Sequence, residues 1–89
     1  MTTFNKDPDA VLDYTWDWSD WLPSGDTIAS YTFTVPAGIT KDSDSNTTTA
    51  VTAWMSGGTA GLSYDVVCHI VTTAGREDDR TITFFVGER

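Results

Sequence analysis

Cys68 and His69 are adjacent, and a thiol beside an imidazole is a pairing used in nucleophilic catalysis. Tyr64, Val66, Cys68 and Ile70 recur at every second position, which predicts a β-strand whose neighbouring side chains point to opposite faces. The two groups then cannot share a proton, and the sequence contains no second histidine. We expect Cys68 to be a small apolar core group and His69 to lie on the outer face.

An acidic run at Asp42–Asn46 resembles the first half of an EF-hand calcium loop. That loop needs glycine at its sixth position and a bidentate glutamate at its twelfth, where this sequence has Thr47 and Ala53. We therefore predict a polar hairpin tip at Asp42–Asn46, with no metal and no cofactor. The alternative is a cadherin-like calcium site built from aspartates of other segments, namely Asp13, Asp17 or Asp78.

The composition argues against several classes of function. Thirteen acidic residues in 89 will form chance carboxylate pairs, and without a cleft such pairs are solvated charges rather than a glycosidase site. The glycines at Gly57-Gly58 precede no helix and so form no phosphate cradle. A net charge of −8 with five basic residues opposes nucleic-acid binding, and no apolar run approaches a membrane span. We therefore expect a protein that is not an enzyme, does not bind nucleic acid and does not associate with a membrane.

The tryptophan-rich segment Asp13–Leu22 contains three of the four tryptophans and three aspartates. A strand over Val11–Trp18 would place the large rings on one face and the acids on the other. The inner set is Leu12, Tyr14, Trp16 and Trp18, and the outer set is Asp13, Thr15 and Asp17. This period of two is typical of a half-buried strand, and it predicts that the rings anchor a small core.

Similar alternation continues along the chain between clusters of turn residues. We expect further strands at Thr27–Val35, Thr47–Met55, Tyr64–Ile70 and Ile82–Val86, and a shorter one at Ile39–Lys41. A charged hairpin tip is predicted at Thr73–Asp79. The buried face of Thr47–Met55 stays open between two sets, Val51/Ala53/Met55 and Ala50/Thr52/Trp54.

The predicted fold is all-β, because 16 threonines and seven valines favour a pleated surface. Short strands with short loops predict a single antiparallel β-sandwich, Ig-like or fibronectin-III-like, over residues 11–89. In such sandwiches a corner tyrosine bonds back to nearby backbone, and Tyr64 is the candidate here.

The N-terminal residues 1–10 lack alternation, and we expect an extended arm there. Phe4 would be its apolar anchor beside Lys6 and Asp7, and a partner would order the arm by docking it on a sheet edge. Phe85 falls opposite the inner set Ile82/Phe84/Val86, so we expect an exposed ring there. The candidate protein-interface residues are thus Phe4, Lys6, Asp7 and Phe85; no catalytic, metal or cofactor residue is predicted.

The order of motifs along the chain resembles a family of small tailed-phage virion proteins of the fibre–tail adaptor type. The motifs are Lys6-Asp-Pro8, Ala10-Val-Leu-Asp-Tyr14, Trp16-Asp-Trp-Ser-x-Trp-Leu22, Gly25-Asp-Thr-Ile28, Pro36-x-Gly-Ile39, Trp54-x-Ser-Gly-Gly-Thr-Ala-Gly61, Tyr64-x-Val66 and Ile70-x-Thr-x-x-Gly-Arg76. The resemblance spans about Lys6 to Val86, and the Phe84-Phe85 pair departs from it.

The resemblance implies a non-enzymatic structural component of the virion. Because the N-terminus lacks a charged-then-apolar signal pattern, we expect the protein to be made in the host cytoplasm. As an adaptor it would dock on the tail or neck and attach a fibre, in repeated copies or a homo-oligomeric ring, with other virion proteins of the tail, neck, fibre or capsid as partners. Two alternatives stay open: a capsid cement or decoration protein, and a carbohydrate-binding module for host attachment whose tryptophans stack on sugars.

Overall fold

The computed structural model describes residues 2–87, and within that range the chain forms β-strands and no helix. No helix that could cross a membrane therefore occurs in this range. The strands are β1 (Thr2–Lys6), β2 (Leu12–Asp17), β3 (Ile28–Thr34), β4 (Ile39–Asn46), β5 (Ala50–Gly57), β6 (Ser63–Thr72) and β7 (Glu77–Val86).

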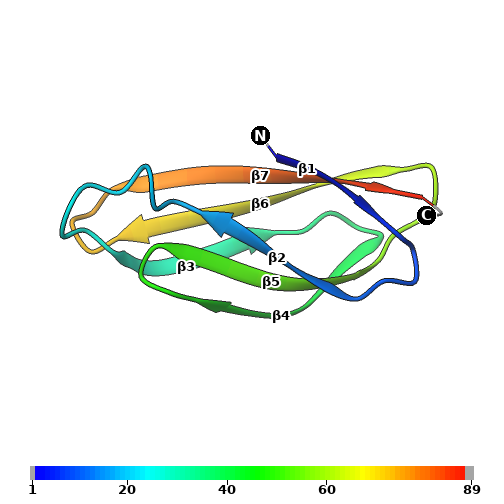
Figure 1. Ribbon diagram of the computed structural model, residues 1–89, viewed down its shortest axis with the longest axis horizontal. Helices are drawn as coiled ribbons and strands as arrows, with labels where there is room; N and C mark the ends of the chain where they lie inside the picture. The colour runs from blue at the N-terminus through cyan, green and yellow to red at the C-terminus, as the bar shows by residue number, and fades with distance from the viewer. Residues whose placement is uncertain (1, 88–89) are drawn as a thin grey trace.

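The strands form two sheets that face each other in an elongated sandwich (Figure 1). One sheet has the order β1-β7-β6-β3 and the other the order β2-β5-β4. The predicted all-β sandwich is confirmed, with one correction: β1 runs parallel to β7, while the other pairs are antiparallel. β2-β5-β4 follows the B-E-D order of an Ig sandwich and β3-β6-β7 its C-F-G order. The more specific Ig-like name stays a prediction.

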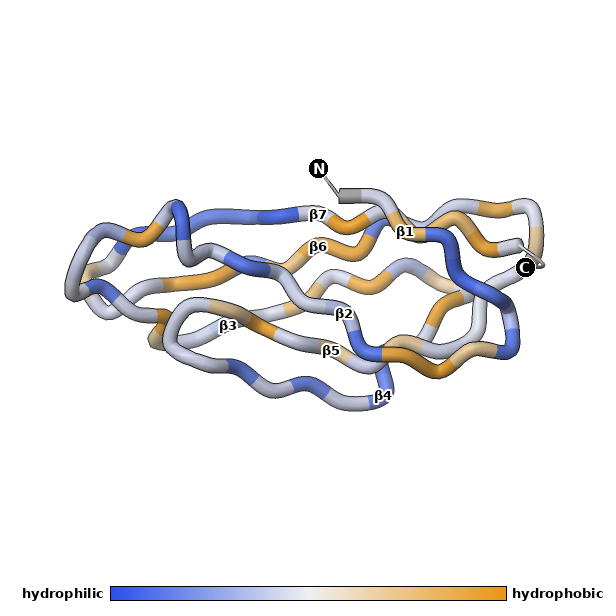
Figure 2. Tube along the Cα trace, viewed as in Figure 1, coloured by the Kyte–Doolittle hydropathy of each residue, from blue (hydrophilic) through white to orange (hydrophobic). Residues whose placement is uncertain are grey.

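The core lies between the sheets and is built from the inward positions of alternating strands. Trp16 and Trp18 of β2 are almost fully buried, as the alternation predicted. β6 contributes Tyr64, Val66, Cys68 and Ile70, and β7 contributes Ile82, Phe84 and Val86. Along β6 the apolar segments recur in Figure 2, as expected for a strand with one face in the core.

Tyr64 fixes the loop that precedes β6. Its hydroxyl accepts a hydrogen bond from the amide of Thr59 at 3.0 Å, so the predicted bond from this tyrosine to nearby backbone is present. Its ring packs against Gly38, where a Cβ would come within 2.9 Å of the Tyr64 Cε1 atom. Gly38 also has a φ of +101°, so glycine is required there for two reasons.

The segment Asp42–Asn46, predicted as a hairpin tip, is instead part of β4. The turn that joins β4 to β5 lies at residues 47–49, where the Thr47 amide donates to the Ala50 carbonyl at 2.9 Å. A register shift between Lys41 and Ser43 interrupts the pairing of β4 with β5. The acidic run was misread because alternating aspartate and serine satisfies a strand as well as a loop.

The charged tip predicted at Thr73–Asp79 is also shorter, because β7 begins at Glu77. The strand predicted at Thr47–Met55 begins at Ala50. Of the two sets of residues that could have faced the core, Val51, Ala53 and Met55 are the buried ones. Leu12, predicted to face the core, is 42% exposed because it begins β2 at the end of the sandwich.

The extended N-terminal arm expected over residues 1–10 requires a larger correction. Residues 2–6 form β1, which pairs with β7 from Thr2 opposite Ile82 to Lys6 opposite Val86. The segment is therefore an edge strand of the domain rather than an arm outside it. Met1, which the predicted arm includes, and residues 88–89 lie outside the described range.

Candidate docking surfaces

Lys6 belongs to the interior of the domain, although the sequence suggested a docking residue. The side chain is fully buried, and its Nζ donates to the carbonyls of Gly57 at 2.7 Å and Asp7 at 3.0 Å. Burial lowers the pKa of this ammonium, and the charges of Asp7, Asp9 and Asp42 act in the opposite direction. Lys6 thus ties β1 to β5, and its charge is not presented to a partner.

Phe4 also has a role inside the domain. Its ring centroid lies 5.2 Å from that of Tyr14 and 6.4 Å from that of Phe84, so it covers the core where β1 approaches β2. The side chain is still 37% exposed. Asp7 follows β1 and its carboxylate accepts the amide of Asp9 at 2.9 Å, which stabilises the turn toward β2.

Phe85 lies on the outer face of the sheet β1-β7-β6-β3, in the register that the sequence predicted. Its neighbours Phe84 and Val86 are buried, whereas its own ring is 51% exposed. Asn5 and Ser63 pair with it from the strands on either side. A half-exposed phenylalanine on a sheet face is a candidate contact residue.

Trp54 is the corresponding residue on the opposite sheet, and the sequence left its orientation open. It lies on the outer face of β2-β5-β4, is 44% exposed, and pairs with Asp13 of β2 and Ser43 of β4. Alternation alone could not identify it, because both faces of β5 carry apolar residues. Phe85 and Trp54 therefore expose aromatic rings on opposite faces of one sandwich.

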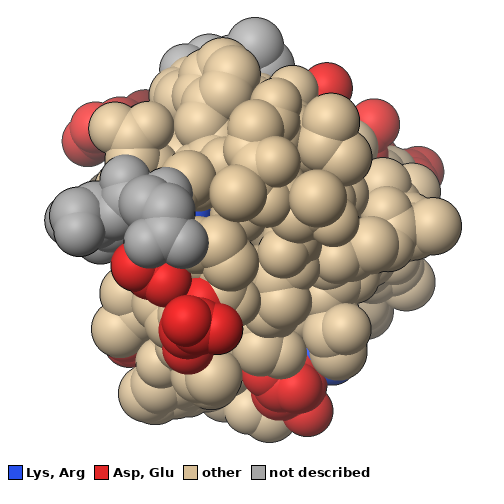
Figure 3. Space-filling view, turned by 90° about the vertical axis from the view of Figure 1, so that its right-hand side faces the viewer, with Lys and Arg blue, Asp and Glu red and all other residues tan. Residues whose placement is uncertain are grey.

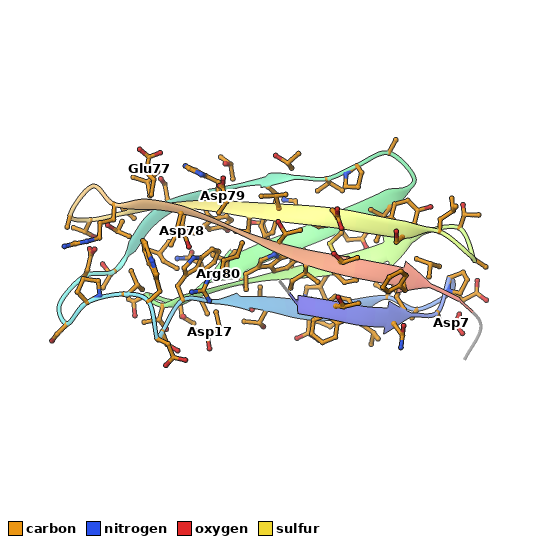
Figure 4. The ribbon with its side chains drawn as sticks, turned by 90° about the horizontal axis from the view of Figure 1, so that it is seen from above. Asp7, Asp17, Glu77, Asp78, Asp79 and Arg80 are labelled. Atoms are coloured by element: carbon orange, nitrogen blue, oxygen red, sulfur yellow. The ribbon has the colours of Figure 1, made fainter. Side chains whose placement is uncertain are left out.

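Charged side chains gather at one end of the molecule, where Figure 4 labels Asp17, Asp78 and Arg80. The indole of the buried Trp18 donates to the Asp78 carboxylate at 3.0 Å. The Arg80 guanidinium lies 5.5 Å from the centroid of the Trp18 ring and 3.7 Å from Asp78, and it donates to the carbonyl of Asp17. These residues form a partly exposed site within one chain, in which a tryptophan and an aspartate together bind an arginine.

Asp26 joins two loops at the same end. Burial would raise the pKa of this carboxyl, but hydrogen bonds from Thr72, Ala74, Arg76 and Thr27 outweigh burial and lower it. The Arg76 guanidinium contacts it at 3.0 Å. The pair therefore holds the β2–β3 loop against the β6–β7 hairpin.

All four described basic side chains are engaged within the domain. Lys6 binds carbonyls, Lys41 pairs with Asp44, Arg76 with Asp26, and Arg80 with Asp78. Figure 3 shows the end of the molecule that carries the C-terminal end of β7: acidic patches and uncharged surface dominate it, and blue is almost absent. This end of the molecule is thus acidic and otherwise largely uncharged.

The groups considered for chemistry lie apart, as the strand alternation predicted. Cys68 is fully buried, and burial raises the pKa of its thiol to about 12. His69 lies on the outer face between Asp79, 2.5 Å from Nδ1, and Glu77, 2.9 Å from Nε2. Within residues 2–87 no group of three or more histidine, cysteine or acidic side chains is placed to hold a metal ion.

Of the comparisons with known proteins, the match to a family model indicates a role in assembly. No curated protein gives a significant match to the chain. A family model described as "Podophage GP4 fiber-tail adaptor protein gp77" matches residues 6–85, from the end of β1 to the end of β7. Because the match covers nearly the whole chain, this protein belongs to the phage fibre–tail adaptor family gp77, a family of structural proteins of the virion.

Proposed function

We propose that this adaptor is held between two virion proteins, docking on the tail or neck with one outer face of the sandwich and receiving a fibre on the other. The observation that carries the proposal is the placement of Phe85 and Trp54. Each ring is about half exposed, and the two lie on the outer faces of opposite sheets. Exposed aromatic rings contribute strongly to protein interfaces. A domain with one such ring on each face is suited to contact two partners at once.

The folded domain supports this role because side-chain contacts link separate strands and loops at both of its ends. Lys6 connects β1 to β5 of the opposite sheet, and Asp26 connects the loops at the far end. A connector that transmits load between a tail and a fibre gains from such cross-links. We further propose that repeated copies surround the tail, so that each copy presents the same two faces.

Single substitutions test the two contacts separately. Phe85→Ala and Trp54→Ala should each give particles that lose one attachment: in one variant the adaptor is missing from tails, and in the other it is on tails that lack fibres. Thr48→Ala, in the exposed β4–β5 turn, is the control and should assemble normally. Electron microscopy and quantitative immunoblotting of purified particles supply the readout. Normal adaptor and fibre content in both aromatic variants would refute the proposal.

The same particles separate the adaptor from a capsid cement protein. An adaptor on a single tail occurs in about a ring's worth of copies, whereas a cement protein occurs in hundreds. Labelled adaptor should appear at the tail or neck and not across the capsid. A copy number in the hundreds with label over the capsid shell would favour the cement alternative.

A further inference from the structure

We propose that Trp54 and Asp13 together form the seat for an arginine side chain of the partner that binds the outer face of β2-β5-β4. This inference rests on the proposed function, because it names the chemistry of one of the two contacts. The residues lie directly opposite each other in the β2–β5 pair. Directly opposite residues have Cβ atoms about 4.5–5.5 Å apart, so one ligand group can touch both side chains.

The two side chains offer what a guanidinium needs. Trp54 is 44% exposed and presents an indole, the aromatic ring that binds cations best. Asp13 is exposed beside it and offers a carboxylate that can accept two parallel N–H bonds. A planar guanidinium stacks on the ring and bonds the carboxylate at once, whereas the point charge of a lysine cannot do both as well.

The chain already contains this arrangement in filled form. At the charged end, Arg80 lies 5.5 Å from the ring centroid of Trp18 and 3.7 Å from the carboxylate of Asp78. Trp54 and Asp13 offer the same two groups, an indole ring and a carboxylate, on an outer sheet face. No cation–π contact to Trp54 occurs in the described part of the chain, where the two such contacts are Lys41 with Phe33 and Arg80 with Trp18.

Charge indicates that the arginine comes from another protein rather than from a second copy. The other positions that face outward with Trp54 on β5 and with Asp13 on β2 are Ala50, Thr52, Ser56, Thr15 and Asp17, so those two strands place no cation there. Each described basic side chain already has an internal partner. With a net charge of −8, two copies also repel each other. The net charge therefore favours a basic, arginine-bearing segment of a different virion protein as the occupant.

The experiment uses the isolated protein and a defined probe, the peptide acetyl-Gly-Arg-Gly-amide. NMR of the tryptophan indole N–H groups follows Trp54 directly, with the buried Trp16 and Trp18 as internal references. The arginine peptide should shift the Trp54 signal in a saturable way, and the matched citrulline peptide, which is neutral and nearly isosteric, should not. Raising the salt concentration should weaken the effect, because the site is exposed.

Two matched variants locate the carboxylate that takes part. Asp13→Asn should weaken the apparent affinity for the arginine peptide by roughly two- to fivefold, the range expected for an exposed ion pair. Asp20→Asn makes the same charge change in the β2–β3 loop and should leave the affinity unchanged. Equal losses in both variants would show attraction to general negative charge and would overturn the proposal.

Other outcomes are equally decisive. A Trp54 signal that does not move, or that moves equally with citrulline, overturns the arginine seat. A shift at Trp54 with neutral oligosaccharides such as maltohexaose, without one from the arginine peptide, would identify a sugar platform instead. If Trp54→Ala abolishes attachment in particles while the arginine titration is flat, the two-sided adaptor stands and only the arginine inference fails.

Discussion

The ammonium of Lys6 donates a 2.7 Å hydrogen bond to the carbonyl of Gly57, 51 residues further along the chain. Lys6 ends β1 in one sheet and Gly57 ends β5 in the other, so the bond crosses the sandwich. A buried lysine is costly unless its donors are used, and here it meets two carbonyls. Lys6, which the sequence placed in an extended N-terminal arm, therefore links the two sheets by a hydrogen bond.

Lys6→Met should destabilise the domain, because it keeps the packed stem and leaves the Gly57 carbonyl without its donor. We expect a loss of about 1–3 kcal/mol in the free energy of unfolding, which is about 4–8 °C in the melting midpoint per kcal/mol. Lys41→Met is the control, since Lys41 pairs with Asp44 near the surface and such pairs contribute about 0–1 kcal/mol. Thermal melts followed by circular dichroism measure both variants. Equal melting midpoints for Lys6→Met and Lys41→Met would contradict a stabilising link between the sheets through Lys6.

Phe84 and Phe85 are neighbours with opposite environments, so their alanine variants should behave differently. Phe84 is fully buried and contacts Tyr14 with ring centroids 4.6 Å apart, so Phe84→Ala should cost about 3–5 kcal/mol. Phe85→Ala should leave the melting midpoint nearly unchanged. Thermal denaturation of both variants checks the register of β7, and a large loss at Phe85 would show that its ring is buried.

Substitutions at Gly38 and Tyr64 should lower the free energy of unfolding by different amounts. Tyr64→Phe removes the acceptor for the Thr59 amide and should cost about 0.5–1.5 kcal/mol. Gly38→Ala should cost more, because it combines a positive φ, worth about 1–2 kcal/mol, with a Cβ placed 2.9 Å from the Tyr64 ring. Urea denaturation ranks the two variants. The reverse order would mean that the ring moves aside easily.

His69 should make stability depend on pH. The carboxylates of Asp79 and then Glu77 raise the pKa of this imidazole above its usual 6.5. A raised pKa in the folded state contributes stability that is fully present below about pH 6.5 and is lost as the pH rises through the folded value. The melting-point advantage over His69→Gln should therefore be largest in mild acid and shrink in mild alkali. An advantage that grows with pH would contradict this assignment.

Calcium should not be required for stability. Asp44 already accepts the Tyr31 hydroxyl at 2.5 Å and pairs with Lys41, and Asp17 accepts the amide of Ser19 at 2.8 Å. Adding chelator should leave the melting curve in place, because no bound ion would be lost from the native state. A fall in the midpoint that calcium reverses would revive the cadherin-like alternative.

Local pattern was enough to predict much of the fold. Trp16 and Trp18 alternate with polar residues, and Tyr64, Val66, Cys68 and Ile70 recur at every second position, so their inward faces followed from a period of two. Phe85 was placed on the outer face by the same reasoning. The all-β class followed from composition, since β-branched residues dominate.

The rest depends on contacts between distant residues. β1 has no period of its own and becomes a strand because β7 offers it a free edge. Lys6 is buried only because Gly57, far along the chain, supplies a carbonyl. Trp54 faces outward because Ala53 and Met55 meet the opposite sheet, and no rule within β5 could choose between its two apolar faces.

The pairing of β1 with β7 also determines when the protein can finish folding. During translation, β1 is made before β7 and has no partner in its sheet until β7 has been made. Until then Phe84 is absent, and Tyr14 and Phe4 lack the ring on which they pack. Pairing of β1 with β7 therefore waits until the strands between them have been made, and pairing between segments so far apart in sequence is slow. Until β7 pairs with it, β1 lacks its partner strand, and unpaired strand edges are prone to aggregation.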